Sequence, residues 1–220
     1  MLAGFGIGVG NYLVARISSQ GAVALAYVGL VAFFLLSIGR GSQFIMNKIK
    51  HGTFVDYNKS NFFTNEKEFK YQNIIPLMGN GLTNLVNLTA LTYAYKYAMI
   101  AGINQGVILT LNSMAVLYNV IIFYLLFKEK VNAIQLTGIA FMLSCVALLS
   151  INGTTKESDN VDGVDKRYYA FLSIACGLIS PMALSTKHIV IRSYKKSYNT
   201  WDMAIDGLIL EYVLYVVLAF

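Results

Sequence analysis

The sequence predicts an all-α fold, a polytopic membrane helix bundle of about seven transmembrane helices. Of its 220 residues, 56% are hydrophobic and only 13% are charged, which is about half of the roughly 25% charged residues in an average soluble domain. Uncharged runs approach or exceed the ~18–20 residues that cross a bilayer. These runs recur along the whole chain, so a cleaved leader at the N-terminus does not explain them.

Seven segments have this apolar character, and each must be a helix because a chain in lipid satisfies its backbone polar groups within the segment. They are residues 2–17, 21–39, 72–97, 101–127, 131–151, 168–191 and 202–220. The links at 18–21 and 128–131 are short, which predicts antiparallel hairpins of helices one and two and of helices four and five. Residues 40–70 are predicted to form a long charged loop and residues 152–167 a polar, acidic loop.

Lysine and arginine residues are divided unequally between the two sets of connections. The set 40–70, 128–130 and 187–196 holds twelve of them, and the other set holds five. Short cytoplasmic loops carry an excess of positive charge. The N-terminus, the 40–70 loop and the connection around 192–200 are therefore predicted to be cytoplasmic, and residues 152–167 extracytoplasmic.

Other classes of protein find little support in the sequence. The net charge of +6 does not indicate nucleic-acid binding, because the basic residues lie between apolar runs and not on one soluble face with aromatic residues. Cys145 and Cys176 fall within apolar segments and form no CxxC pattern, so no disulfide framework or metal site is expected. No pattern links a nucleophile to a base. We expect no enzyme activity, no cofactor, no metal and no nucleic-acid partner.

Amide side chains form stripes on two consecutive predicted helices. At 100° per residue, Asn80, Asn84 and Asn87 fall within an arc of about 60°. The next helix carries three amides that are seven residues apart and drift by only ~20° per step: Gln105, Asn112 and Asn119. The two stripes are candidates to line one polar pathway. The alternative is that they join neighbouring helices, where each hydrogen bond contributes roughly 0.6–2 kcal/mol.

Polar residues in the last two predicted helices are further candidates for this pathway. Ser180 precedes Pro181, and a helix break at the proline would free backbone carbonyls near the membrane centre; the alternative is a packing kink. Glu211 is expected near the membrane midplane, with no cation at its depth. Asp206 is expected to pair with Lys187 or His188.

The stretch Tyr93–Asn152 resembles the drug/metabolite transporter superfamily, of the EamA-like type. The matching features are a short link into the fourth helix, the pair Glu129 and Lys130 at its cytoplasmic end, and Gln135 and Gly138 at the start of the fifth helix.

The resemblance implies a ten-helix carrier built from two inverted five-helix repeats. Residues 1–151 would form the first repeat, 152–167 an extracytoplasmic loop, and 168–220 the first two helices of a truncated second repeat. The resemblance also implies that helices one, three and four of a repeat line the central cavity, which adds Asn11 to the candidate pathway.

We therefore expect a multi-pass membrane carrier that moves a small polar metabolite by alternating access. Its partners would be the lipid bilayer and a small polar solute, with a homodimer left open. One alternative is a seven-helix receptor, which would normally need an N-terminus outside the cell. The other is a membrane scaffold that does not transport, in which the amides contribute only to stability.

Overall fold

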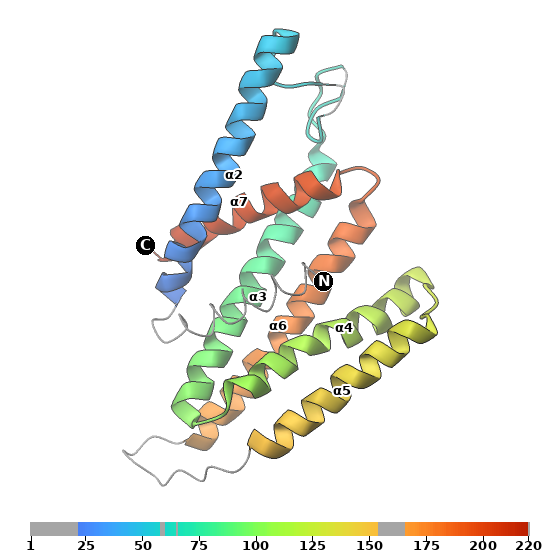
Figure 1. Ribbon diagram of the computed structural model, residues 1–220. Helices are drawn as coiled ribbons and strands as arrows, with labels where there is room; N and C mark the ends of the chain where they lie inside the picture. Colours follow the sequence, from blue (N-terminus) through green and yellow to red (C-terminus); the bar gives the residue numbers. More distant parts are fainter. Residues whose placement is uncertain (1–21, 58–59, 65, 154–165, 220) are drawn as a thin grey trace. The chain divides into compact units, whose positions relative to one another are not determined.

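The computed structural model describes residues 22–57, 60–64, 66–153 and 166–219 (Figure 1). The predicted span 2–17, with Asn11, lies outside these residues, and so do residues 154–165 of the predicted extracytoplasmic loop. Within the described ranges the chain is all-helical and has no named strand. The elements are α2 Ala22–His51, the 3-10 helix η2 Tyr71–Asn73, α3 Ile74–Ala101, α4 Gln105–Phe127, α5 Ala133–Gly153, α6 Lys166–Tyr194 and α7 Thr200–Ala219.

Three helical stretches in the described part of the chain are long and apolar enough to cross a membrane. They are Tyr71–Ala101, Gln105–Phe127 and Lys166–Tyr194. Each coincides with a predicted span. The predicted spans 21–39, 131–151 and 202–220 are helical as well, but the count of seven spans stays a prediction.

Helix α2 is much longer than the sequence predicted. The prediction of a loop from residue 40 was wrong for residues 40–51, because α2 continues to His51. Positive charge does not oppose this extension, since Lys48, Lys50 and His51 lie in the last turn, where the helix dipole favours cations. The helix ends at Gly52, which has a φ of +72° and donates its N–H to Lys48 O at 3.0 Å, as is common at helix C-termini.

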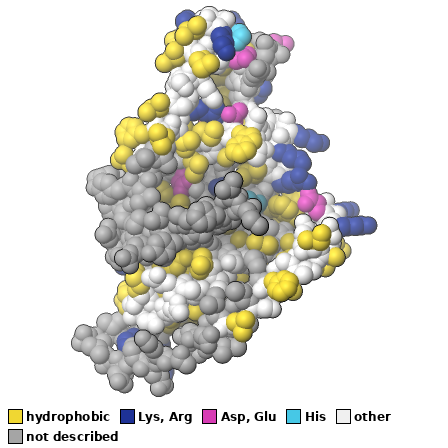
Figure 2. Space-filling model, in the orientation of Figure 1, with side chains coloured by type: hydrophobic (Ala, Val, Ile, Leu, Met, Phe, Trp, Pro, Cys, Tyr) yellow, Lys and Arg dark blue, Asp and Glu magenta, His cyan; other side chains and the backbone are white. Residues whose placement is uncertain are grey.

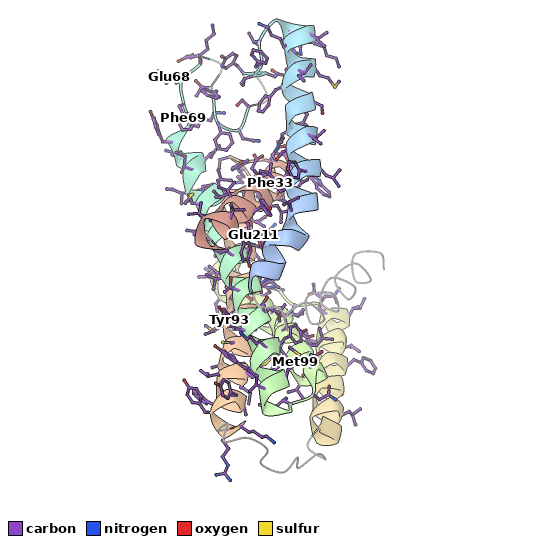
Figure 3. The ribbon with its side chains drawn as sticks, turned by 90° about the vertical axis from the view of Figure 1, so that its left-hand side faces the viewer. Phe33, Glu68, Phe69, Tyr93, Met99 and Glu211 are labelled. Carbon is purple, nitrogen blue, oxygen red and sulfur yellow. The ribbon has the colours of Figure 1, made fainter. Side chains whose placement is uncertain are left out.

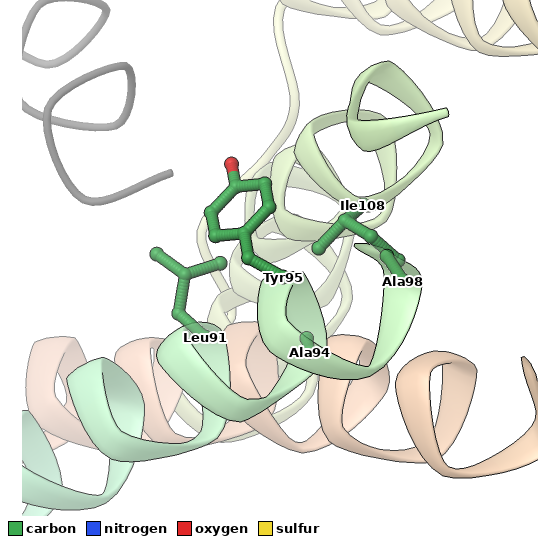
Figure 4. Close-up of a cluster of buried hydrophobic side chains, with 5 residues drawn as sticks. All are labelled: Leu91, Ala94, Tyr95, Ala98 and Ile108. Carbon is green, nitrogen blue, oxygen red and sulfur yellow. The ribbon is translucent and has the colours of Figure 1, made fainter. Parts of the chain in front are cut away.

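The chain divides into two compact units, and the division passes through α3 and α6. The described part of the first unit comprises residues 22–25, 86–153 and 166–186. Its core is a stripe of α3 at the spacing of one helix face, which packs against α4 (Figure 4). The core residues are Leu91, Ala94, Tyr95, Ala98 and Ile108. Ala94 is fully buried, and its small side chain lets the Ser173 hydroxyl of α6 donate to Ala94 O at 2.9 Å.

Helices α4 and α5 of the first unit form the predicted hairpin (Figure 1). Lys128 follows α4 with a φ of +53° and donates its N–H to Phe123 O, which is the left-handed ending found at many helix C-termini. The short link between the two helices is therefore confirmed, and it makes them antiparallel neighbours.

The described part of the second unit comprises residues 26–57, 60–64, 66–85 and 187–219. Its contacts fix the direction of its helices. Asn84 and Leu85 of α3 bind Glu211 and Tyr215 of α7, and Asn80, one turn earlier, binds Met203. Because the partners advance together along both helices, α3 and α7 point in the same general direction in this unit, and α7 crosses α3 obliquely (Figure 1).

The end of α6 runs antiparallel to α3 within the second unit. Here Gly79 faces Val190, whereas Asn84 binds Lys187, which comes earlier in α6. The connection before α3 and the connection between α6 and α7 therefore emerge at the same end of this unit.

Large apolar side chains cover the outside of several helices. On α2 the stripe of Phe34, Ile38, Ile45 and Ile49 is exposed, with Ile49 78% accessible. Apolar side chains lie at the surface along α2 in Figure 2. Exposed apolar faces of this kind are typical of helices that contact lipid or other protein.

Candidate functional site

A group of polar and charged side chains is buried between α3, α6 and α7 of the second unit, and we call it the Glu211 cluster: Asn80, Asn84, Lys187 and Glu211. The Lys187 ammonium donates to Asn84 Oδ1 at 2.8 Å, and Asn84 Nδ2 donates to Glu211 Oε2. Glu211 is only 4% exposed. One amide thus bridges a half-buried cation and a buried carboxyl group. Figure 3 labels Glu211, next in sequence to Tyr212, whose ring stacks on Phe33 of α2 with 4.6 Å between ring centroids.

Asn80 is the least exposed member of the cluster, at 2%. Its Nδ2 donates to Met203 O at 2.7 Å, whereas its Oδ1 has no hydrogen-bond partner among the described residues. Its side chain occupies the space beside Gly207, where a Cβ would come within 2.8 Å of Asn80 Cγ. An unsatisfied buried oxygen costs roughly 1–3 kcal/mol, so a donor at this position would stabilise the cluster.

The partners of two acidic residues differ from those expected. Glu211 was expected to have no cation at its depth, and this was wrong, because Lys187 is linked to it through Asn84 and attracts it electrostatically. Asp206 was expected to pair with Lys187 or His188, but it binds Arg40. The cause of the second error is the extension of α2, which places Arg40 inside a helix and not in a loop.

A second group of polar side chains lies in the first unit and joins α3, α4 and α6. We call it the Ser180 cluster: Asn87, Asn112 and Ser180. The Ser180 hydroxyl is 2.8 Å from Asn87 Oδ1 and 3.0 Å from Asn112 Oδ1. A hydroxyl has one proton and can donate to only one of these oxygens at a time. The structure thus brings together one amide from each predicted stripe.

Helix α6 continues through Pro181, so the helix break considered at this position is absent. The Ser185 hydroxyl binds Pro181 O at 2.9 Å and lies 3.3 Å from Ala115 O of α4. Ser173, Gly177, Ser180 and Ser185 are all buried. Small residues of this kind let helices approach closely.

The remaining two candidates lie elsewhere on α4. Gln105 is its first residue, and Asn119 lies two turns beyond Asn112; both are half-buried. Each is about 10 Å from Asn112 along the helix axis at 1.5 Å per residue. Neither is among the hydrogen-bond partners of Ser180 in the described residues.

Sequence reasoning missed a polar network at the loop end of the second unit. Arg40 of α2 pairs with Asp202 and Asp206 of α7, each at 2.8 Å. Asn61 Nδ2 donates to Asp202 Oδ2 at 2.9 Å, and the Tyr198 hydroxyl donates to Asp206 Oδ2 at 2.7 Å. The signal in the sequence is the spacing of the two aspartates, which places them on one helix face and makes a shared cation favourable.

The network shifts the pKa values of two of its members. Burial lowers the pKa of the Arg40 guanidinium, but the carboxylates of Asp206 and Asp202 outweigh this effect and raise it above its usual value. The pKa of the Tyr198 phenol is raised, first by burial and then by its hydrogen bond to Asp206. Both groups therefore keep their protons throughout the physiological range.

Comparisons with protein-family models, curated proteins and solved structures found no match to this chain.

Proposed function

We propose that the chain is a multi-pass membrane carrier that moves a small polar metabolite by alternating access. The Glu211 cluster is the observation that carries this proposal. Ionisable residues within membrane helices are costly, and they usually mark a substrate or ion pathway. Here a lysine and a glutamate are linked through an amide on a third helix, and the neighbouring Asn80 has an oxygen that lacks a donor.

The wider architecture belongs to the same proposal. We propose seven spans, an N-terminus in the cytoplasm and an EamA-like five-helix repeat followed by the start of a second. In the second unit, the connection before α3 and the connection between α6 and α7 emerge at the same end. Asn61 Nδ2 donates to Asp202 Oδ2, and the Asn199 N–H donates to Asn61 Oδ1. These contacts support the part of the proposal that places both connections on the same side of the membrane. The positive-charge count favours a cytoplasmic location for both connections.

Uptake into proteoliposomes tests the proposal. The purified chain is reconstituted, and labelled sugars, polyols and zwitterionic solutes are supplied with and without a pH gradient. We expect at least one solute to accumulate faster than in protein-free vesicles, with a dependence on the gradient that Glu211→Gln removes. Glu66→Gln, in an exposed position of the loop before α3, is the control and should transport like the wild type. An unchanged gradient dependence in Glu211→Gln would remove Glu211 from the mechanism.

A scaffold that does not transport is the second candidate, and the Ser180 cluster favours it. Asn87 and Asn112 bind one hydroxyl across three helices, as side chains that merely hold helices together would do. The scaffold predicts no uptake of any solute, and it predicts that Asn84→Leu and Asn112→Leu change only the melting temperature. Uptake of a solute by the wild-type chain that folded Asn112→Leu protein lacks would exclude it.

A further inference from the structure

One side of helix α2 packs against α7 within the second unit. The Phe33 ring stacks on Tyr212 of α7, and Arg40 pairs with two aspartates of the same helix. Asn47 lines a cavity to which α7 also contributes. These three residues of α2 are half-buried and lie seven residues apart, an interval that returns to nearly the same side of a helix. We call this side the inner face of α2.

The opposite side carries side chains at alternating intervals of three and four residues, and we call it the outer face of α2: Leu35, Ile38, Ser42, Ile45 and Ile49. Its four apolar members are between 59% and 78% accessible, and Ser42 is exposed as well. Intervals of three and four residues are those of positions a and d in a coiled coil. The residues of the inner face then fall at position f, on the side away from the partner helix.

Lipid tails do not cover the whole outer face. The 30 residues of α2 form a helix about 45 Å long at 1.5 Å per residue, whereas a hydrocarbon core is only ~30 Å thick. A typical tilt of about 20° shortens the span of the helix very little. Lys48, Lys50 and His51 in the last turn mark this end of α2 as the end outside the core. Ile45 and Ile49 therefore lie beyond the tails.

Other parts of the chain leave this end of the outer face open. The loop before α3 lies on the other side of α2, because the cavity between them is lined from α2 by Arg40, Gln43, Phe44 and Asn47, none of which belongs to the outer face. The predicted hairpin of the first two spans, with its link at 18–21, brings residues 2–17 back only as far as about residue 38. Ile45 and Ile49 lie beyond that point.

A second copy of the chain fits the outer face. Copies in a membrane share one orientation, so the outer faces of two copies meet in parallel around a two-fold axis. Gly39 and Gly41 flank Ser42, and a Cβ at either glycine would meet nothing within 4 Å, which allows two helices to approach closely. Lys48 and Lys50 fall at positions g and b, so neither cation faces its own copy across the axis.

The exposed area is sufficient for a specific contact. At these accessible fractions each apolar side chain presents roughly 100 Å². Met46, next to the outer face, is 50% accessible and would join the contact. Five such side chains from each of two copies cover on the order of 1,000 Å², the lower end for a specific interface. We propose that two copies of this chain pair in parallel through the outer face of α2.

Cysteine cross-linking in proteoliposomes at a low protein-to-lipid ratio tests the proposal. Single cysteines are introduced into the full chain without Cys145 and Cys176. Ile49→Cys lies on the outer face, and Lys50→Cys lies next to it at position b; both residues are exposed. A mild oxidant should join Ile49→Cys protein, and Ser42→Cys protein one heptad earlier, into covalent dimers. Lys50→Cys protein should remain monomeric.

A charge placed on the outer face provides a second measurement. Ile49→Lys should weaken self-association at least about tenfold, which corresponds to roughly 1.4 kcal/mol. The readout is energy transfer between labelled copies as the vesicles are diluted with lipid. His51→Lys introduces the same side chain at position c and should associate like the wild type. Because Ile49 is exposed, Ile49→Lys should keep the melting temperature of the wild type.

Covalent dimers of Ser42→Cys and Ile49→Cys that Lys50→Cys does not form, together with weaker association of Ile49→Lys, support the proposal. Equal cross-linking of Ile49→Cys and Lys50→Cys overturns it. The absence of covalent dimers at both outer-face positions also overturns it and leaves lipid or another protein as the occupant. Unchanged association of folded Ile49→Lys overturns it as well. The inference uses the proposed span of α2 but not transport, so a failure of the uptake experiment leaves it unchanged.

Discussion

At the scale of single residues, Gly207 is required by the position of the Asn80 side chain. A Cβ at residue 207 would lie 2.8 Å from Asn80 Cγ and closer still to Nδ2. We expect Gly207→Ala to destabilise the protein by about 1–3 kcal/mol, the usual cost of overpacking. The measurement is thermal unfolding in detergent.

Gly138 of α5 provides the matched control for this prediction. A Cβ there meets nothing within 4 Å, so Gly138→Ala should be neutral or stabilise by up to about 1 kcal/mol, because alanine favours helix. Combining Gly207→Ala with Asn80→Ala should restore part of the lost stability. Equal melting temperatures for the two single variants would show that α7 does not approach Asn80 this closely.

Tyr198 gives a prediction about pH. Burial and the Asp206 carboxylate raise the pKa of its phenol, so the folded protein retains this proton above pH ~10, where an unfolded tyrosine loses it. The contribution to stability is thus full below about pH 10 and is lost as the pH rises further. The difference in tyrosinate absorbance between wild type and Tyr198→Phe should stay flat near pH 10 and change only when the protein unfolds. A tyrosinate step near pH 10 that the variant lacks would contradict this.

The sequence predicted which polar residues share a helix face, but not which partners they bind. The arc of Asn80, Asn84 and Asn87 follows from the helical period alone. Their partners Met203, Glu211 and Ser180 lie about ninety to 130 residues further along the chain. Such pairs depend on which helices become neighbours, and helical period carries no information about that.

At the scale of elements, the Arg40 network joins the extended helix α2 to α7. Arg40 and its two aspartates are each less than a third exposed. We expect Arg40→Gln to cost about 1–3 kcal/mol of stability, between the value for an exposed ion pair and that for a buried one. The variant leaves Asp202 and Asp206 close together without their cation.

Lys50→Gln is the control for Arg40→Gln, because Lys50 is an exposed cation on the same helix. Lys50→Gln should change the free energy of unfolding by no more than about 0.5 kcal/mol, as most surface substitutions do. Thermal unfolding of the two variants in the same detergent provides the comparison. A similar loss of stability in both variants would mean that the ion pairs between Arg40 and α7 contribute little to stability.

The sequence placed the hairpin of α4 and α5 correctly because a short link leaves two long helices few arrangements. It misplaced the end of α2 because charge was taken as a sign of a loop. Arg40 is instead neutralised by carboxylates more than 160 residues away. A local charge pattern cannot report a partner at that distance.

At the scale of the whole molecule, the sidedness of the connections can be tested by cysteine labelling. Cysteines replacing Thr53 and Ser197, in a chain without Cys145 and Cys176, should react with an impermeant reagent from the same side of the membrane. Both belong to the end of the second unit where its two connections meet. Labelling of the two positions from opposite sides would rule out the proposed orientation.

Composition and hydropathy indicated a membrane protein, because the share of charged residues is about half of that in an average soluble domain. They gave the positions of the three helices that are long and apolar enough to cross a membrane. The number of spans and the solute of the proposed transport do not follow from apolar run length. They depend on how each helix is placed in the bilayer and on which side chains face water.

The contacts between α3 and α7 restrict how these two helices can slide past each other. They recur at intervals of four residues, with the Asn80 side chain packed against Gly207 and Asn84 bound to Glu211. A shift by one or two residues would push an amide against a bulky side chain such as Leu210, which already fills the space at Gly81. A shift by a full turn, about 5.4 Å, would instead place an amide where its neighbour had been. Any rearrangement along this seam is thus expected to occur in discrete one-turn steps and not as a continuous glide.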